Sequence, residues 1–199
     1  MHYFAVQVWT GHEQDYIRQL ERDQSFAENF HIYLPTRKLN LRKLGKLKAV
    51  EQPVFPGYVF LEAPDAVLDR NLRWRLRTCN HFIRLLPATN QPRPLVDKDR
   101  LLLSHFISLH RPADTSKVYF DENDRIVVVE GALKGLEGCI VKVNRRKGRV
   151  KVLLDMCGSA FSLDLGFETI ERADKSSTDQ ATANQASADK GSANQHEST

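Results

Sequence analysis

The sequence predicts an α+β fold in which helices flank an antiparallel sheet, and a small all-β barrel follows in the same chain. Three observations carry this prediction. Strand-like and helix-like patterns alternate through residue 110, whereas from residue 124 onward only short β patterns and glycine-rich turns remain. The last segment, residues 173–199, contains no aromatic residue and no Leu, Ile or Val. Such a tail cannot bury enough apolar surface to offset its ordering entropy, so we expect it to be disordered.

Each element of the first part has its own signal. The opening strand is β-branched and aromatic (YFAVQVW), and the helix after it places Tyr16, Ile17 and Leu20 on one face. Gly45 interrupts leucines that are interleaved with arginine and lysine, which favours a basic hairpin over one helix. Asp97 is a suitable N-cap for the last helix. The expected elements are strands at 3–9, 30–35, 54–62 and 81–86, helices at 12–26, 65–79 and 97–109, and a hairpin at 37–48.

The pattern changes after a segment that composition predicts to be a linker. It contains charged residues and proline but little hydrophobic periodicity. Beyond it, a barrel of roughly 50 residues is expected, a size at which marginal stability is normal. Its four expected strands lie at 125–130, 138–144, 149–155 and 160–165. The predicted organisation is a first domain at 1–110, a linker at 111–123, a barrel at 124–172 and a tail at 173–199.

The folded part of the chain is expected to be basic. The formal net charge of the whole sequence is +4, but the tail holds two lysines and four acidic residues. Residues 1–172 therefore carry 27 basic and 21 acidic side chains, a net charge of +6. This balance favours a polyanionic partner, and the basic residues cluster in the hairpin and in the turn at 145–149.

The cysteines and the N-terminus indicate an intracellular protein. Cys79, Cys139 and Cys157 are too far apart for a CxxC pair, so we expect reduced thiols. The N-terminus lacks the basic and apolar segments of a signal peptide. No apolar run approaches the roughly 20 residues that span a bilayer. The sequence therefore predicts a soluble, cytoplasmic monomer that does not bind membranes.

Catalytic motifs are missing from the sequence. It contains no GxSxG, P-loop, HExxH or strand-linked GxGxxG pattern. The seven histidines occur singly, and His12 and Glu13, the nearest approach to an acid–base pair, are neighbours that do not face each other on a helix. No cysteine has a partner at zinc-binding spacing. We expect a protein that is not an enzyme, with no catalytic residues, no metal site and no cofactor.

Two stretches carry most of the functional information. The first, EQPVFPGYVFLE, places Tyr58 and Phe60 on one face of an extended strand, with Phe55 just before a Pro-Gly bend. Composition alone favours burial of such aromatic residues, although an exposed one would be an anchor for protein binding. The second, residues 124–152, runs from a strand through GALKGLEG into strands joined by a basic turn. Its three glycines permit a tight backbone path.

Together these stretches resemble the NusG family of transcription elongation factors, in which an NGN domain precedes a KOW domain. FAVQVWTGHE resembles the opening strand and turn of the family, and FPGYVF is close to its most recognisable motif. GALKGLEG and SLDLGFETIE complete the KOW pattern, so the resemblance covers residues 3–172. It implies an NGN-type sheet, an SH3-like KOW barrel, and a factor that binds RNA polymerase and suppresses pausing and termination.

The resemblance also implies which residues bind polymerase. Phe55, Tyr58 and Phe60 occupy the strand that packs on the clamp helices of RNA polymerase in the family. An exposed aromatic patch is therefore expected at this strand. Holding the clamp closed would shift polymerase away from its paused conformation by differential binding.

Further positions are candidates for nucleic-acid binding. Gln19 and Arg22 lie where specialised relatives contact the exposed non-template DNA strand, and Arg77 falls on a neighbouring helix. Arginines beside a single strand attract phosphate and stack on bases. For Arg73 and Arg75, a solvated charge and a nucleic-acid contact are equal alternatives. The basic hairpin and turn contribute the remaining candidates, Arg42, Lys43, Arg145, Arg146 and Lys147.

The sequence departs from the housekeeping members of the family at one loop. Those members carry an aromatic and a basic residue there, which engage the termination factor Rho and a ribosomal protein, whereas this chain has Cys157 and Ser159. The basic hairpin is more similar to specialised paralogues of the LoaP type, which implies an operon-specific antiterminator that recognises a leader RNA hairpin. Basic turns suit RNA, which is bound by shape and charge, although a solvated surface explains the 145–149 turn equally well.

An alternative from another class is a stand-alone KOW-type RNA-binding or ribosome-associated protein. This alternative predicts RNA affinity with a steep salt dependence and no association with polymerase.

Overall fold

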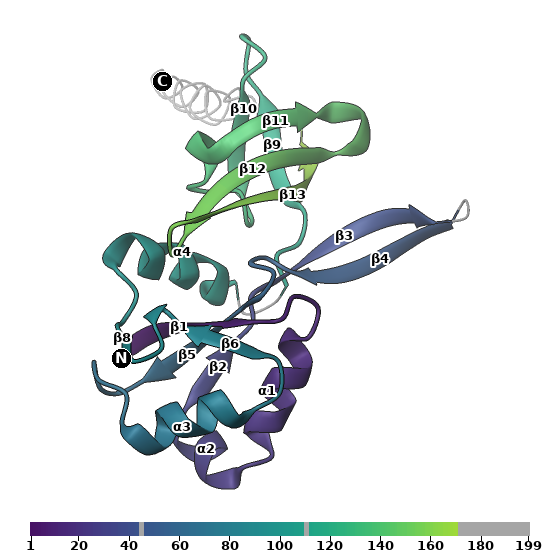
Figure 1. Cartoon of the computed structure of the whole chain (residues 1–199). Coiled ribbons are helices and arrows are strands. Elements are labelled where there is room, and N and C mark those ends of the chain that lie inside the picture. The colour runs from purple at the N-terminus through teal and green to yellow at the C-terminus, as the bar shows by residue number, and fades with distance from the viewer. Residues whose placement is uncertain (44–45, 110–111, 171–199) are drawn as a thin grey trace, which may run out of the picture. The chain divides into compact units, whose positions relative to one another are not determined.

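The first part of the chain builds a four-stranded antiparallel sheet with the strand order β2-β5-β1-β6. These strands are β1 (His2–Val8), β2 (His31–Tyr33), β5 (Tyr58–Ala63) and β6 (Phe82–Leu85). The structure, a computed structural model, describes residues 1–43, 46–109 and 112–170, without the side chains of 25, 40–43 and 46–47 (Figure 1). β1 lies at the centre and pairs with β5 from His2↔Ala63 to Gln7↔Tyr58. The mixed fold predicted from the sequence is confirmed.

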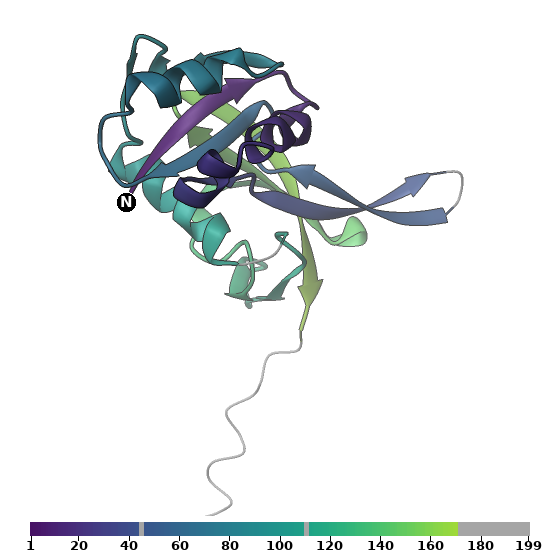
Figure 2. The ribbon, with the colours of Figure 1, turned by 90° about the horizontal axis from the view of Figure 1, so that it is seen from below.

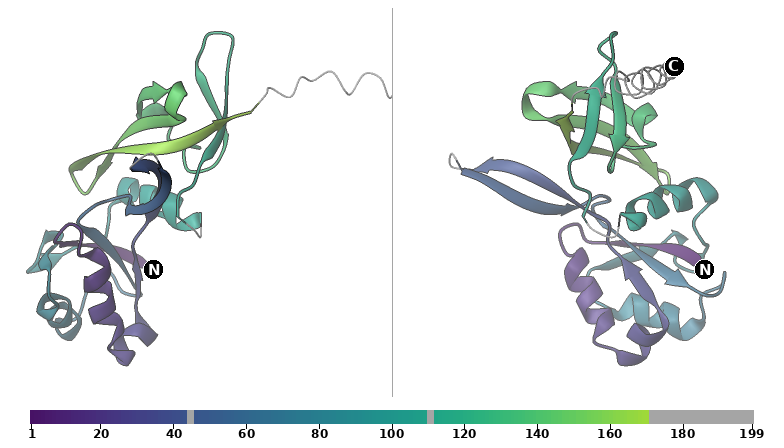
Figure 3. Two further views of the ribbon diagram at one scale, coloured as in Figure 1. Left: turned by 90° about the vertical axis from the view of Figure 1, so that its right-hand side faces the viewer. Right: turned by 180° about the vertical axis from the view of Figure 1, so that it is seen from behind.

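Alternation along the strands gives the sheet two apolar faces. Phe4, Val6, Val59 and Leu61 point to one side, where they pack with three helices in a single core. These helices are α1 (Glu13–Glu21), α2 (Gln24–Asn29) and α3 (Arg70–Thr78). The other side packs against α4 (Asp97–Ser108), which lies between the sheet and the barrel (Figure 3).

The helix boundaries correct two predictions. The segment 12–26 is two helices rather than one, because Asp23 caps a new start and its side chain accepts a hydrogen bond from Phe26 N at 3.3 Å. The last helix does begin at Asp97, but Val96 occupies the N-cap position and Asp97 belongs to the first turn. An acidic residue in the first turn still interacts favourably with the helix dipole.

The basic hairpin predicted around Gly45 is confirmed. β3 (Thr36–Lys43) and β4 (Lys46–Pro53) pair from Thr36↔Pro53 to Lys43↔Lys46. They form an arm that projects from the sheet (Figure 2). A further short pair, β7 (Pro87–Ala88) and β8 (Gln91–Pro92), follows β6.

The second part is a five-stranded barrel with the order β10-β9-β13-β12-β11. Its strands are β9 (Ser116–Phe120), β10 (Ile126–Glu130), β11 (Ile140–Asn144), β12 (Arg149–Met156) and β13 (Ser159–Thr169). β9 lies inside the segment predicted to be a linker, so that prediction is wrong over residues 116–120. The strand is short, and only Ser116 and Val118 point inward, which is too little alternation to stand out in the sequence.

Residues 1–169 form one compact unit. The predicted disordered tail, 173–199, lies outside the described residues. Within the described part of the chain, no helix has the length and apolar character needed to cross a membrane.

Candidate functional site

Three aromatic residues mark the sheet face opposite α1, α2 and α3. Phe55, Tyr58 and Phe60, here called the aromatic face, are 1%, 5% and 0% exposed. The sequence correctly places Tyr58 and Phe60 on one side, since both belong to the core on that side of the sheet. The expectation of an exposed patch is wrong: all three side chains are buried in this structure.

The aromatic face is covered from elsewhere in the chain. Phe161 of β13 makes edge contacts with Phe55 and Tyr58, each with a centroid separation of 5.4 Å. The Tyr58 hydroxyl hydrogen-bonds with Ser159 Oγ at 3.1 Å. From α4, Phe106 lies 5.7 Å from Phe55, ring centroid to ring centroid. The β12–β13 end of the barrel therefore closes a surface that the first part of the chain leaves apolar.

Polar contacts fix the barrel to α4. The buried Asp99 carboxylate accepts a hydrogen bond from Cys157 N at 3.1 Å. Burial, reinforced by this carboxylate, raises the pKa of the Cys157 thiol to about 12. Lys98 pairs with Asp155 at 2.8 Å, and its hydrogen bond to that carboxylate raises the pKa of Lys98. His105 Nε2 donates to the Ala132 carbonyl at 2.9 Å. This mixture of apolar and polar contacts is typical of an interface.

A buried carboxylate positions the bend that precedes the aromatic strand. Glu13 is 3% exposed and accepts hydrogen bonds from Gly57 N at 2.7 Å and Gly11 N at 2.8 Å. Gly57 has φ +82°, and a Cβ there would lie 2.8 Å from Thr10 Oγ1, so glycine is required. Sequence reasoning considered Glu13 only as an acid–base partner of His12 and missed this structural role. An acidic residue at the first position of α1 was the available signal.

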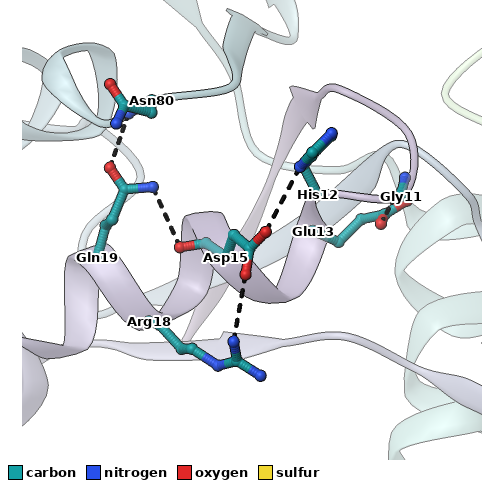
Figure 4. Close-up of polar contacts among 7 residues, drawn as sticks. All are labelled: Gly11, His12, Glu13, Asp15, Arg18, Gln19 and Asn80. Carbon is teal, nitrogen blue, oxygen red and sulfur yellow. Dashed lines mark hydrogen bonds and ion pairs between the residues drawn. The ribbon is translucent and has the colours of Figure 1, made fainter.

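Three candidate nucleic-acid residues, Gln19, Arg22 and Arg77, lie on α1, just after α1 and on α3. Gln19 accepts a hydrogen bond from Asn80 N at 2.9 Å and donates to the Asp15 carbonyl at 3.2 Å (Figure 4). The bond from Asn80 N ties α1 to the segment that follows α3. Arg22 and Arg77 are exposed. The structure therefore links Gln19 to Asn80, three residues after Arg77, and the nucleic-acid role of these residues stays a prediction.

An aromatic cluster that sequence reasoning missed adjoins this position. The rings of His12 and His81 stack with centroids 4.1 Å apart and planes 14° from parallel. Trp9, which is 57% exposed, lies 5.5 Å from His81, again between ring centroids. His81 has φ +71°, a conformation uncommon for a residue other than glycine. Trp9, His12 and His81 thus present exposed ring surface beside Gln19 and Asn80.

Ligand atoms of His12, Asp15 and His81 also lie within 4.8 Å of one another. Imidazole nitrogen coordinates a metal in the plane of its ring. Two stacked rings in nearly parallel planes cannot direct both lone pairs at one ion. The Asp15 carboxylate instead accepts from Arg18 at 3.2 Å and lies 3.4 Å from His12 Nδ1 (Figure 4). The geometry favours an aromatic stack over a metal site.

The arginines of α3 differ in their surroundings. Arg75 pairs with Asp23 of the α2 N-cap, and Arg73 donates to the Asn90 carbonyl at 3.3 Å. Trp74, between them in sequence, is 67% exposed. Both arginines are thus engaged in contacts within the fold.

The other basic candidates lie on the arm and on the barrel. Arg42 and Lys43 belong to β3, and their side chains lie outside the described part of the structure. Arg145 pairs with Asp124 at 2.9 Å and lies 3.8 Å above the centre of the Phe120 ring, so it ties the turn at 145–147 to the end of β9 and the turn that follows it. Arg146 and Lys147 are exposed in a one-turn 3₁₀ helix, where Asn144 caps Lys147 N at 3.0 Å.

Comparison with known proteins gives consistent matches. The family model described as "Transcription termination factor nusG" matches residues 1–103. A Streptococcus pyogenes serotype M3 protein, "Transcription termination/antitermination protein NusG", is 26% identical over 164 residues, which are 79% of this chain and 88% of that protein. The protein of the same name from Helicobacter pylori strain J99 is 23% identical over 179 residues, covering 86% and 98% of the two chains.

A solved structure agrees with these sequence matches. The structure described as "Domain interaction in Thermotoga maritima NusG" superposes with a TM-score of 0.51 and 15% identity. The match covers 83% of this chain and 93% of that one, and it supports the fold. With the family model matching more than half of the sequence, the chain belongs to the NusG family.

Proposed function

We propose that this NusG-family transcription factor binds RNA polymerase through the aromatic face and suppresses pausing and termination, as an operon-specific antiterminator without catalytic activity. The observation that best supports this proposal is the chemistry of that face. Phe55, Tyr58 and Phe60 form an apolar surface on a sheet that is already stabilised by its own helices on the other side. Aromatic residues gathered in this way are the usual anchors of a protein interface.

In the state described here, polymerase cannot reach the aromatic face until the barrel moves. The contacts that close it are individually modest. A neutral hydrogen bond such as Tyr58–Ser159 contributes about 0.5–1.5 kcal/mol, and one to a carboxylate such as Cys157–Asp99 about 1.5–3 kcal/mol. A partner that binds the open form offsets this cost by its higher affinity for that form. We therefore propose that polymerase binding competes with β13 for the same aromatic residues.

The same movement would release the β12–β13 turn. Met156–Ser159 corresponds to the loop through which the resemblance implies contacts with Rho or a ribosomal protein. In the closed state Ser159 and Cys157 of this turn contact Tyr58 and Asp99. Release would thus free a polymerase-binding face and a second partner surface in one step. Cys157 and Ser159 stand in place of the aromatic and basic residues of housekeeping members, so we propose a different second partner.

Binding of purified core RNA polymerase to the immobilised full chain tests this proposal. Phe161→Ala removes the aromatic cover and leaves Phe55, Tyr58 and Phe60 intact. It should raise affinity for polymerase about tenfold if it lowers the opening cost by about 1.4 kcal/mol. Phe120→Ala is the matched control, because Phe120 packs against Phe167 and Arg145 inside the barrel.

A second substitution separates the binding face from its cover. Adding Tyr58→Ala to Phe161→Ala should abolish the gain in affinity. If the double variant binds as tightly as Phe161→Ala, polymerase binds elsewhere on the chain. Absence of polymerase binding in both the wild type and Phe161→Ala would refute the proposal.

A second proposed activity is contact with the exposed non-template DNA strand. The observation that favours it is the stack of Trp9, His81 and His12 beside Gln19, with Arg22 exposed just after α1 and Arg77 exposed on α3. Stacking of a base on an aromatic side chain contributes about 1–3 kcal/mol and tolerates different bases. Trp9→Ala should therefore weaken binding of a fluorescent single-stranded DNA at least about fivefold. Trp74→Ala, which removes an exposed tryptophan from α3, should leave binding unchanged.

A further inference from the structure

A cavity lies where the base of the β3–β4 arm meets the last turn of α4 (Figure 1). Its volume is about 330 Å³, a size at which small-molecule sites occur. The walls include Tyr33 of β2, Pro35 in the connection to β3, and Phe106 and Ile107 of α4. We call this space the arm-base cavity. It is separate from the contacts proposed above for polymerase and for DNA.

Backbone hydrogen bonds fix the walls of the cavity. Val54 N donates to the Pro35 carbonyl at 2.8 Å. Ala113 N donates to the Thr36 carbonyl at 2.6 Å, and Lys38 N donates to the Ala113 carbonyl at 2.8 Å. The segment that leads to the barrel is thus held against the first residues of the arm. A cavity with walls fixed in this way is formed before a ligand arrives, so binding does not require a loop to become ordered.

The Tyr33 ring is held in one position at the cavity wall. Its hydroxyl donates to Glu62 Oε2 at 2.8 Å, and its ring meets the Tyr3 ring edge-on with a centroid separation of 6.0 Å. Burial, together with the hydrogen bond to Glu62 and the charge of that carboxylate, raises the pKa of Tyr33 to about 12. The hydroxyl therefore stays protonated at neutral pH and keeps donating. An aromatic ring with a carboxylate bonded to its hydroxyl is a favourable surface for a cation.

A carboxylate stands at the same cavity. Glu51 of β4 is exposed, and its Oε1 accepts a hydrogen bond from Thr36 Oγ1 at 2.6 Å. Within the described residues, Glu51 forms no ion pair. Lys38 lies opposite Glu51 in the register of the arm, but its ammonium group pairs with Asp114 at 3.4 Å. The negative charge of Glu51 is thus available to a ligand.

Two further features make the cavity favour positive charge. Arg37, the other cation at the base of the arm, is directed away from Glu51 and donates to the Asp164 carbonyl and to Gln52 Oε1. Phe106 and Ile107 belong to the last turn of α4, and the C-terminus of a helix carries a partial negative charge. An anion would therefore be repelled from this cavity.

We propose that the arm-base cavity binds a small aromatic amine in its protonated form. The ammonium group lies between the Glu51 carboxylate and the Tyr33 ring. The apolar body packs on Phe106 and Ile107. A metal ion fits less well, because one carboxylate and one hydroxyl are too few oxygen ligands for a hard cation and the remaining walls are apolar. This site goes beyond the proposed polymerase and DNA contacts and does not depend on them.

NMR titration of the full-length protein with matched probes tests the site. Phenethylamine, phenethyl alcohol and hydrocinnamate carry the same ring on chains of similar length, and at neutral pH they are cationic, neutral and anionic. Phenethylamine should bind at least about fivefold more tightly than the alcohol, and hydrocinnamate should bind most weakly. N-acetyl-lysine amide, which mimics a lysine side chain of a partner protein, should bind more weakly than phenethylamine because it lacks the ring.

Glu51→Gln tests the charge and retains an acceptor for Thr36. It should weaken phenethylamine binding about fivefold and change binding of the alcohol less than about twofold. Glu137→Gln is the matched control, since Glu137 is an exposed carboxylate of the barrel outside the cavity. Tyr33→Leu should also weaken binding of the amine more than binding of the alcohol, whereas Tyr33→Phe, which keeps the ring, should preserve most of the preference.

Four results would overturn the proposal. If none of the probes binds to the wild type, the cavity is not a binding site for this chemistry. Equal affinity for phenethylamine and phenethyl alcohol would remove the recognition of charge. Equal losses in Glu51→Gln and Glu137→Gln would place the amine elsewhere on the chain. Tighter binding of N-acetyl-lysine amide than of phenethylamine would assign the cavity to a protein side chain. Each failure leaves the polymerase proposal standing, because the assay contains no polymerase.

Discussion

The two faces of the four-stranded sheet are both apolar, yet they are closed in different ways. On the helix-covered face, Phe4, Val6 and Leu61 pack against α1, α2 and α3, all of which come from the first 80 residues. On the aromatic face, the cover includes Ser159 and Phe161, about one hundred positions after Tyr58 in the sequence. Local elements therefore complete one core, and a separate barrel completes the other.

The hydrogen bonds on the two faces of the sheet also differ in whether they join neighbouring elements or separate parts of the chain. On the helix-covered face the buried Tyr16 hydroxyl donates to the Leu76 carbonyl at 2.8 Å, a bond within one packed layer. On the aromatic face, Tyr58–Ser159 and Cys157–Asp99 bridge the barrel to the sheet and to α4. We expect a surface closed by such bridges to open without unfolding either side, whereas opening the helix-covered face should unfold the sheet. Apolar composition alone does not distinguish a core from an interface; the origin of the covering residues does.

The largest expected effect follows from damage to the helix-covered face. Leu61 is fully buried there, and Leu61→Ala should lower the free energy of unfolding by about 2–5 kcal/mol through lost burial and a cavity. Urea denaturation followed by circular dichroism measures this change. Leu153→Ala is the matched control, since Leu153 is 48% exposed on β12 and its truncation should cost less than about 0.5 kcal/mol. A similar small cost for both variants would break the distinction between core and surface on this sheet.

An effect of intermediate size is expected at Cys157, next to the aromatic face. Its thiol should make the free energy of unfolding depend on pH. Its pKa is about 12 in the folded chain, against about 8.5 for an ordinary thiol. Between these values the unfolded chain has lost a proton that the folded chain retains, so stability falls as pH rises above about 8.5. The loss should reach about 1–2 kcal/mol by pH 10.

Cys157→Ser removes this titration, while Cys139→Ser retains it. The free energy of unfolding, measured by urea denaturation at pH 8 and pH 10, should fall further in wild type and Cys139→Ser than in Cys157→Ser. Identical pH dependence in all three proteins would mean that the thiol is as accessible in the folded chain as in the unfolded one. The turn would then not be closed against α4.

How far the sequence predicts this molecule depends on where the determining residues lie. Two features follow from local patterns. The arm follows from Gly45 among leucines that are interleaved with arginine and lysine, and the placing of Tyr58 and Phe60 on one side follows from the period of two along a strand. The break at Asp23 also has a local signal, a capping residue, which the amphipathic pattern of α1 obscured.

Burial of the aromatic face could not be predicted in the same way. It depends on Phe161, and no periodicity near Tyr58 indicates what will cover that side of the sheet. The pairing of Lys142 with Lys151 is similar, because these residues become neighbours only through the register of β11 and β12. The role of Glu13 likewise depends on Gly57, 44 positions away.

The smallest effect concerns the hydrogen bond between Tyr58 and Ser159, and it sharpens the comparison most directly. Tyr58→Phe and Ser159→Ala each remove one partner, so a double-mutant cycle isolates their interaction, with an expected coupling of about 0.5–1.5 kcal/mol.

Each single variant should also speed alkylation of Cys157, because the same opening exposes that thiol. Tyr16→Phe, which removes a hydroxyl on the helix-covered face, should lower global stability without selectively exposing Cys157. Faster alkylation in Tyr58→Phe but not in Tyr16→Phe would show that the two faces open independently. Equal acceleration would mean that the barrel and the sheet unfold as one cooperative unit, and the competition proposed between β13 and polymerase would lose its physical basis.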